Sequence, residues 1–180
     1  MEENEHFSLR FSFLAVSLQP LTVWSETNFS TKNLKKTLVD LFEASVSKYP
    51  NNTFLLEKTG KQFEPTTYTE VKNQVYRLGA GLQALGVKKG DTMALLSEGR
   101  NLWVIGELAM FYAGAVNVPL SIKLEESNDL LFRLKHGDVK YVMVSGTQLK
   151  KIRAIKDQLT LVEKVIVFDE QKEYEDKEIA

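Results

Sequence analysis

The stretch from residue 85 to residue 120 constrains the fold of this 180-residue chain more than any other part. It contains, in order, a glycine-punctuated turn, a short apolar run, a long apolar segment and a second short apolar run: residues 86–91, 92–96, 101–112 and 115–118. Short apolar runs bounded by turn residues are typical of buried strands, and a longer apolar segment is typical of a helix. The stretch therefore predicts two strands that a helix connects.

The same alternation extends over the rest of the chain from residue 34. Predicted helices cover residues 36–48, 69–85, 101–112, 125–135 and 148–159, and predicted strands cover residues 53–57, 62–66, 92–96, 115–118, 139–144 and 163–168. The first two strands form a hairpin. The later strands alternate with helices, which implies right-handed βαβ crossovers. We therefore expect an α/β fold with a mostly parallel sheet that is covered on both faces.

The predicted helix over residues 69–85 has the clearest signals. Thr69 is in place to cap its first turn. Its apolar residues form one stripe at helical spacing: Val71, Val75, Leu78, Leu82 and Leu85. Gly79 and Gly81 weaken a helix interior, so we expect both to pack closely against a neighbouring element. Gly86 is predicted to end the helix in a left-handed conformation.

Composition excludes several classes of site. The chain has no cysteine, which rules out disulfides, thiolate catalysis and zinc–thiolate sites, and it fits a reducing, cytoplasmic location. Its two histidines, His6 and His136, cannot form a metal site of several histidines. His136 is expected to end a helix and complement its dipole. The net charge of −1 gives no electrostatic case for nucleic acid or for an anionic membrane surface.

The two ends of the chain differ from the middle in composition and in the pattern of their apolar residues. Residues 1–33 are read as an N-terminal extension: they begin with acidic residues, Arg10 and Pro20 interrupt their apolar part, and the longest apolar run covers residues 13–16. This pattern favours neither a signal peptide nor a membrane span. Residues 169–180 are rich in acidic side chains and are expected to form a solvated linker. The domain itself is then residues 34–168.

Four short patterns occur in a fixed order along this domain. They are Tyr-x-Glu at residues 68–70, Leu-Gly-Val-x-x-Gly-Asp at 85–91, Ala-Gly-Ala-Val-x-Val-Pro-Leu at 113–120 and His-x-Asp-x-Lys-Tyr-Val at 136–142. Together they resemble the N-terminal part of the large domain of adenylate-forming (AMP-binding) enzymes. The sequence of residues 97–120 is most similar to that of bacterial long-chain fatty acid–CoA ligases.

The resemblance implies a two-step reaction. A fatty acid carboxylate attacks ATP with Mg²⁺ present, which gives acyl-AMP, and the thiol of CoA then displaces AMP. The resemblance places the ATP loop and the catalytic lysine after Ala180, so we expect a piece of a ligase that is inactive alone, with no catalytic residue or metal ligand among residues 1–180. An acyl-acyl carrier protein synthetase and a non-catalytic α/β binding module are alternatives. Oligomeric state and peripheral membrane association stay open.

Lys150 and Arg153 are the candidate cofactor-binding residues. They lie three residues apart in a basic cluster with Lys151 and Lys156, so they share a face of the predicted helix. By resemblance, they correspond to two basic residues that hold the 3′-phosphate of CoA in some acyl-CoA synthetases. The alternative is a solvated helix face.

Three other segments invite a ligand-binding interpretation. Residues 145–147 follow a strand and precede a helix, as a phosphate-binding loop does, but Thr147 as a simple helix cap accounts for them better. Residues 81–88 lack the order of a Walker loop. Arg100 and Trp103 follow the strand at 92–96, where a ligand site is natural, yet a structural Arg100 and a core Trp103 are favoured.

Overall fold

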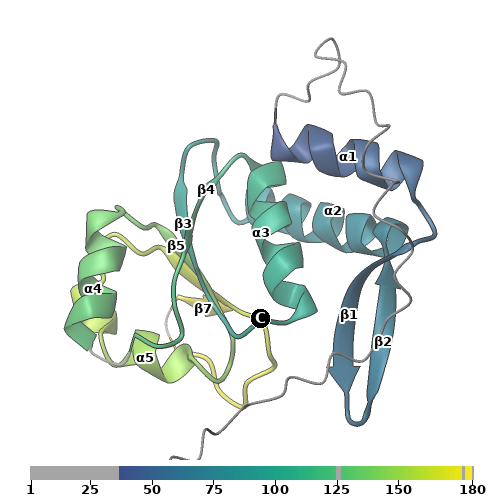
Figure 1. The fold of residues 1–180 in the computed structure, drawn as a ribbon. Helices are drawn as coiled ribbons and strands as arrows, with labels where there is room; N and C mark the ends of the chain where they lie inside the picture. Colours follow the sequence, from purple (N-terminus) through teal and green to yellow (C-terminus); the bar gives the residue numbers. More distant parts are fainter. Residues whose placement is uncertain (1–36, 125–126, 176, 180) are drawn as a thin grey trace, which may run out of the picture. The chain divides into compact units, whose positions relative to one another are not determined.

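The computed structural model describes residues 37–124, 127–175 and 177–179, so the predicted N-terminal extension lies outside the described residues. The helices are α1 (Leu38–Lys48), α2 (Tyr68–Ala84), α3 (Asn101–Ala113), α4 (Ser127–His136), α5 (Leu149–Arg153) and the 3-10 helix η3 (Lys156–Gln158). The strands are β1 (Thr53–Thr59), β2 (Gln62–Thr67), β3 (Thr92–Leu96), β4 (Val116–Pro119), β5 (Tyr141–Val144), β6 (Lys164–Val167) and β7 (Glu178–Ile179) (Figure 1).

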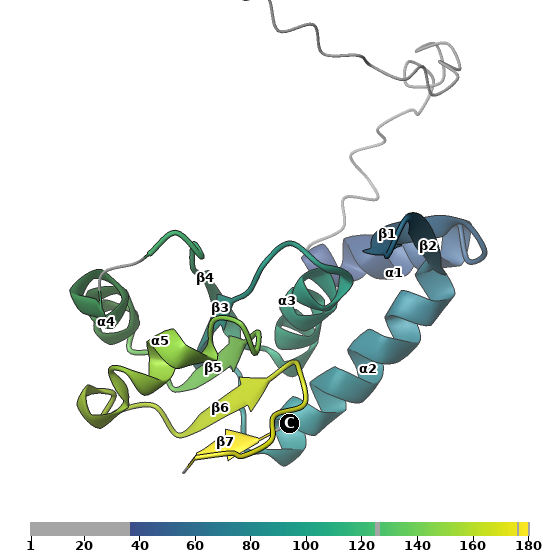
Figure 2. The same ribbon diagram turned by 90° about the horizontal axis from the view of Figure 1, so that it is seen from below.

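The strands form two sheets. β1 and β2 make the predicted antiparallel hairpin, and the other five strands form a parallel sheet in the order β4-β3-β5-β6-β7. In the register of the central strands, Ala94 lies between Val118 and Val142. Helices α2 and α3 lie on one side of this sheet, and α4 and α5 lie on the other (Figure 2). The α/β fold with a mostly parallel sheet is therefore confirmed.

The core consists of two apolar layers, one on each face of the parallel sheet. Successive side chains of a strand point to opposite faces. In β3, Met93 and Leu95 join the layer under α2 and α3, whereas Ala94 and Leu96 join the layer under α4 and α5. All four are fully buried. A strand that is apolar at every position needs cover on both faces, which is why the sequence pattern predicted the parallel sheet correctly.

Helix α2 differs in detail from its prediction. Its N-cap is Thr67, whose hydroxyl accepts from the backbone N–H of Glu70, so the cap predicted at Thr69 was wrong. The C-terminal end follows the prediction: Gly86 has φ +101°, and the Val87 N–H bonds back to the Leu82 carbonyl. Of the two interior glycines, Gly79 packs against α3, because an added Cβ would lie 3.4 Å from the Ala109 carbonyl oxygen.

The prediction that Gly81 packs closely against a neighbouring element was wrong. A Cβ built at Gly81 would meet no atom of the described residues within 4 Å, so no close packing explains this position.

Two segments near the C-terminus also depart from expectation. The helix predicted over residues 148–159 is divided, because α5 ends at Arg153 and η3 follows. Apolar residues three apart, such as Ile152 and Ile155, suit a 3-10 helix as well as an α-helix, and both are buried. The acidic segment expected as a solvated linker contains β7, which pairs with β6.

Candidate functional site

The parallel sheet has a topological switch point between its adjacent strands β3 and β5. From β3 the chain runs through α3 to β4, on one side of β3. From β5 it runs through α5 to β6, on the opposite side of β5 and over the opposite face. In open α/β sheets, ligands bind at the carboxyl ends of strands where the connections diverge in this way. The loops after β3 and β5 are therefore the candidate site.

Glu98 and Gln148 meet across this switch point. Glu98 follows β3 and Gln148 follows β5, and the Gln148 Nε2 donates to Glu98 Oε1 at 2.6 Å. Burial alone would raise the pKa of Glu98, but hydrogen bonding, with that from Gln148 the largest, outweighs burial and lowers the pKa. The switch point therefore holds a carboxylate that stays charged at neutral pH.

The amide of Gln148 is only partly satisfied. Gln148 is 8% exposed, and its Oε1 accepts no hydrogen bond from the described residues. A buried acceptor without a partner costs about 1–3 kcal/mol. A ligand, or another part of the protein, that donated to this oxygen would remove that cost. The switch point thus combines a charged acceptor, Glu98, with an unpaired neutral acceptor, the Gln148 Oε1.

Asp169, which follows β6, connects the two loops. Its Oδ1 pairs with Arg100 at 2.7 Å, and its Oδ2 accepts from the Gly146 N–H at 2.8 Å. Burial would raise the pKa of Asp169, but the Gly146 N–H and the Arg100 guanidinium lower it overall. Arg100 therefore has the structural role that we favoured from the sequence.

The loop at residues 145–147 is not arranged as a phosphate site. The Gly146 N–H, which a phosphate would need, already donates to Asp169. The helix that follows has five residues, and its N-cap is Gln148, so Thr147 is not the cap that the sequence predicted. Trp103 packs against the apolar core, as favoured.

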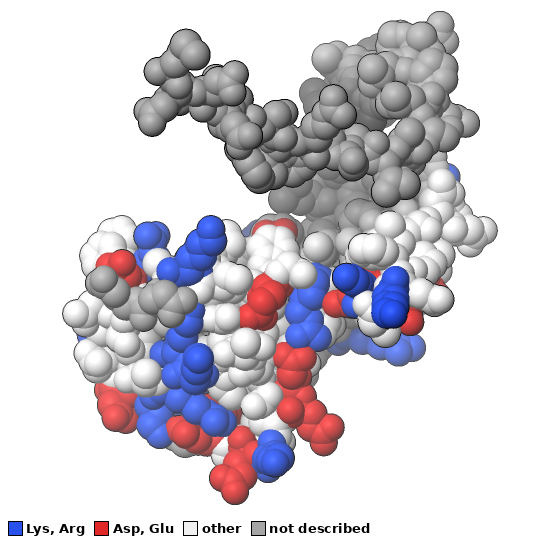
Figure 3. All heavy atoms as spheres, turned by 60° about the horizontal axis from the view of Figure 1, so that its bottom comes forward, with Lys and Arg blue, Asp and Glu red and all other residues white. Residues whose placement is uncertain are grey.

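Lys150 and Arg153 line different hollows. Lys150 borders a groove of about 460 Å³ whose other lining residues are Ile122, Lys123, Thr147, Gln148 and Lys151. Figure 3 shows the Lys and Arg side chains that gather on this face of the molecule. Lys151 Nζ donates to the Ile122 carbonyl and so holds one wall of the groove.

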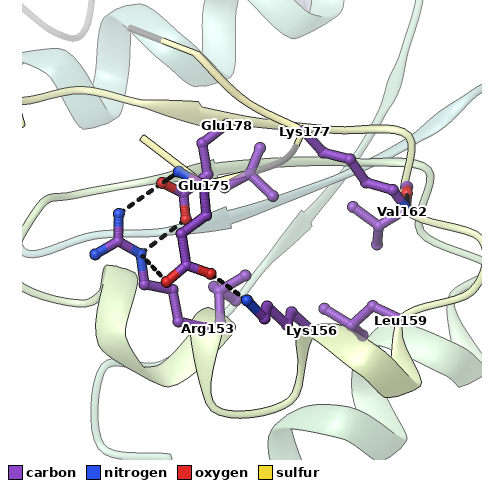
Figure 4. Close-up of a pocket in the computed structure, with 9 residues that line it drawn as sticks. Arg153, Lys156, Leu159, Val162, Glu175, Lys177 and Glu178 are labelled. Atoms are coloured by element: carbon purple, nitrogen blue, oxygen red, sulfur yellow. Dashed lines mark hydrogen bonds and ion pairs between the residues drawn. The ribbon is translucent and has the colours of Figure 1, made fainter. Parts of the chain in front are cut away.

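Arg153 instead points toward the acidic segment (Figure 4). Its Nε and Nη2 donate to the two carboxylate oxygens of Glu178, at 2.9 and 2.7 Å. Glu175 lies 3.6 Å from Arg153 Nε and also pairs with Lys156 at 2.5 Å. The Arg153 hydrogen bonds lower the pKa of Glu178, whose side chain is 4% exposed. The structure thus gives Arg153 an internal partner, and joint phosphate binding with Lys150 stays a prediction.

The sequence analysis missed Glu98, Gln148 and Asp169 as members of one cluster. Each follows a buried strand of the same parallel sheet by two to four residues, at the edge where ligand sites occur. That position was a usable signal. The strand order, however, was needed to show that the loops after β3 and β5 are adjacent.

Comparison with known proteins decides the family. The family model described as "AMP-binding enzyme" matches residues 42–180. The chain belongs to the AMP-binding enzyme family. The resemblance to adenylate-forming enzymes that the sequence motifs indicated is therefore confirmed at this level.

Curated relatives of this AMP-binding chain include enzymes with different printed names. Nonribosomal peptide synthetase sidE of Aspergillus fumigatus is 41% identical over 95 residues, which are 51% of this chain and 4% of that protein. Long chain acyl-CoA synthetase 5 of Arabidopsis thaliana is 30% identical over 149 residues, which are 77% of this chain and 22% of that protein. The chain thus spans less than a quarter of either relative.

Solved structures agree on the fold. The anthranilate CoA ligase AuaEII superposes with a TM-score of 0.67 at 24% identity, over 75% of this chain and 25% of that one. A long-chain-fatty-acid-CoA ligase from Archaeoglobus fulgidus gives 0.67 at 18% identity, over 74% of this chain and 27% of that one. The five-stranded sheet therefore matches the N-terminal part of the large domain of this superfamily.

In the described part of the chain, no group of three or more acidic or histidine side chains is arranged to hold a metal ion, so we assign no Mg²⁺ ligand. The described helices are also too short or too polar to cross a membrane.

Proposed function

We propose that this chain is part of an ATP-dependent long-chain fatty acid–CoA ligase. The observation that supports the proposal is the length of the matches taken together with their identity. Three long chain acyl-CoA synthetases of Arabidopsis thaliana match over 118 to 149 residues at 30% identity, whereas the peptide synthetase with 41% identity matches over 95 residues. Surfactin synthase subunit 1 of Bacillus subtilis matches over 143 residues at 27%. A fatty acid substrate is therefore favoured over an amino acid.

The proposed reaction has two steps. A carboxylate oxygen of the fatty acid bonds to the α-phosphorus of ATP, and pyrophosphate leaves. The sulfur of CoA then bonds to the acyl carbon, the thiol proton is lost, and AMP leaves. In this scheme the ion pair of Arg100 with Asp169 and the hydrogen bond of Gln148 to Glu98 brace the carboxyl edge of the sheet. They position loops and do not react.

Substrate class is tested by ATP–pyrophosphate exchange. The product of the complete open reading frame that encodes residues 1–180 is assayed with palmitate, anthranilate and a panel of amino acids. We expect kcat/KM for palmitate to exceed that for the other acids by about a hundredfold or more, because a pocket built for an alkyl chain disfavours small polar acids. Faster exchange with an amino acid or with anthranilate would contradict the proposal.

We also propose that Lys150, and Arg153 once it leaves Glu178, bind the 3′-phosphate of CoA. Replacing Lys150 with alanine should raise the KM for CoA by about tenfold, because one charge-assisted contact is lost. Exchange without CoA should be unchanged, and Lys123→Ala in the same groove serves as the matched control. Dephospho-CoA lacks the 3′-phosphate, so an equal loss with dephospho-CoA would show that Lys150 does not contact that phosphate.

A further inference from the structure

A second groove lies at the amino edge of the parallel sheet, opposite the candidate site. It has a volume of about 380 Å³, and its lining residues come from the end of α4, the segment between α4 and β5, and the segment between η3 and β6: Leu134, Lys135, Val139, Leu159, Thr160, Leu161 and Val162. In both ribbon views, α4 and the connection from α5 to β6 lie at the same end of the sheet (Figures 1 and 2). None of its lining residues belongs to the candidate site or to the proposed CoA site.

The floor of the groove is apolar and buried. Leu134, Val139, Leu159 and Val162 are at most 5% exposed and belong to the apolar layer under α4 and α5. The wall is different, because Leu161 is 52% exposed and lies outside that layer. Leu161 therefore adds exposed apolar surface beside the buried floor of the groove.

One cation stands at the rim of the groove. Lys135 is exposed and is the one charged residue among the lining residues. Among the described residues, no carboxylate forms an ion pair or hydrogen bond with it. Asp138, which is the nearest acidic residue along the chain, and Glu163, which lies next to the lining residue Val162, do not line the groove, and Glu163 accepts from the Tyr141 hydroxyl. The rim therefore offers an unpaired positive charge next to an apolar trough.

We propose that this groove binds the alkyl chain of an anionic amphiphile, with its carboxylate on Lys135. The volume corresponds to about a dozen groups of the size of a water molecule or a methylene, which suits a chain of medium length. An apolar lining with a single charged group is the usual composition of a small-molecule site. The inference rests on this lining and not on the proposed reaction, whose candidate site lies at the opposite edge of the sheet.

The test is calorimetric titration of the complete protein with dodecanoate, below its micelle concentration and without ATP or CoA. We expect saturable binding of dodecanoate, and weaker binding of dodecylammonium, which has the same chain and the opposite charge. Hexanoate should bind more weakly as well, because it buries fewer methylenes.

Two variants locate the site. Lys135→Glu should weaken dodecanoate binding by about tenfold or more and reverse the preference over dodecylammonium, and Leu161→Asp should weaken it by a similar factor. Both side chains are exposed, so neither change disturbs the core. The controls are Lys61→Glu and Leu56→Asp on the β1–β2 hairpin, where Lys61 is exposed and Leu56 is 60% exposed. They should change binding less than about twofold.

Three results would overturn the proposal. The first is the absence of saturable dodecanoate binding. The second is a loss of dodecanoate affinity in the hairpin controls that equals the loss in the groove variants. The third is a concentration-dependent dimer that Leu161→Asp abolishes, which would give the groove to a second copy of the chain. Because the titration contains no ATP or CoA, failure here leaves the exchange assay unaffected, and failure of the exchange assay leaves this result unaffected.

Discussion

At the level of single residues, the start of α2 depends on Thr67. Its hydroxyl accepts from the Glu70 N–H at 3.3 Å, and the Glu70 carboxylate accepts from the Thr67 N–H at 2.7 Å. Thr67→Ala removes the side-chain half of this capping box and should lower the free energy of unfolding by about 1 kcal/mol. Urea denaturation followed by circular dichroism measures the change. Thr67→Ser is the control, because serine keeps the hydroxyl that accepts from the Glu70 N–H. An equal loss in both variants would contradict the assignment of the cap.

Arg153 is the second residue whose role can be isolated. Its two hydrogen bonds to the buried Glu178 carboxylate attach β7 to α5. Arg153→Met keeps much of the aliphatic stem but leaves the carboxylate unpaired, so backbone amides near residues 178–179 should exchange hydrogen about tenfold faster or more. The double variant Arg153→Met with Glu178→Gln should recover part of the protection, because no buried charge then lacks a partner. Unchanged exchange in the single variant would show that strand pairing alone holds β7.

At the level of elements, the two glycines of α2 are expected to respond in opposite directions. Gly81 is exposed in a helix interior with open space around it, so Gly81→Ala should raise the free energy of unfolding by about 0.5–1 kcal/mol through helix propensity. Gly79 is buried against Ala109 and Tyr112 of α3, so Gly79→Leu should lower it by about 1–3 kcal/mol through overpacking. Thermal and urea unfolding of both variants check the signs. Equal effects would mean that α2 and α3 do not pack as described.

The same elements show how far sequence reasoning reached. The core strands and α3 were predicted well, because fully apolar runs with glycine or proline boundaries admit few alternatives. The cap of α2 was misplaced by two residues, since Thr67 and Thr69 are both good caps and the choice depends on where β2 ends. The division of α5 from η3 was not visible, because buried residues three apart fit both kinds of helix. Strand β7 was missed because Glu178 is neutralised by Arg153, a contact that only folding creates.

At the level of the whole molecule, the candidate site was less predictable than the fold. Loops after β3, β5 and β6 supply Glu98, Gln148 and Asp169, which are up to 71 residues apart in the sequence. Their proximity follows from the strand order β4-β3-β5-β6-β7, and the alternation of helices and strands does not specify that order. Sequence reasoning therefore identified the segments that border the sheet but could not say which of them meet.

The interaction of Glu43 with three side chains connects α1, α2 and α3 and gives stability a dependence on pH. Glu43 pairs with Lys72 at 2.7 Å and accepts hydrogen bonds from Tyr76 and Tyr112. Burial would raise the pKa of Glu43, but Lys72 and the two tyrosines lower it below its ordinary value of 4.5. The folded state therefore holds fewer protons on this group than the unfolded state near that pH. Its contribution is complete above the unfolded pKa and is lost as pH falls through the folded pKa.

Substituting Glu43 tests this sign directly. Glu43→Gln should lower the free energy of unfolding most at pH 7, where the wild-type carboxylate is charged and paired. The difference between the two proteins should narrow as pH falls from about 5 to 3, because protonation removes the same charge from the wild type. Urea denaturation at a series of pH values measures both curves. A difference that stays constant with pH would show that Glu43 stabilises the helices by packing alone, since only the loss of a charged interaction varies with protonation.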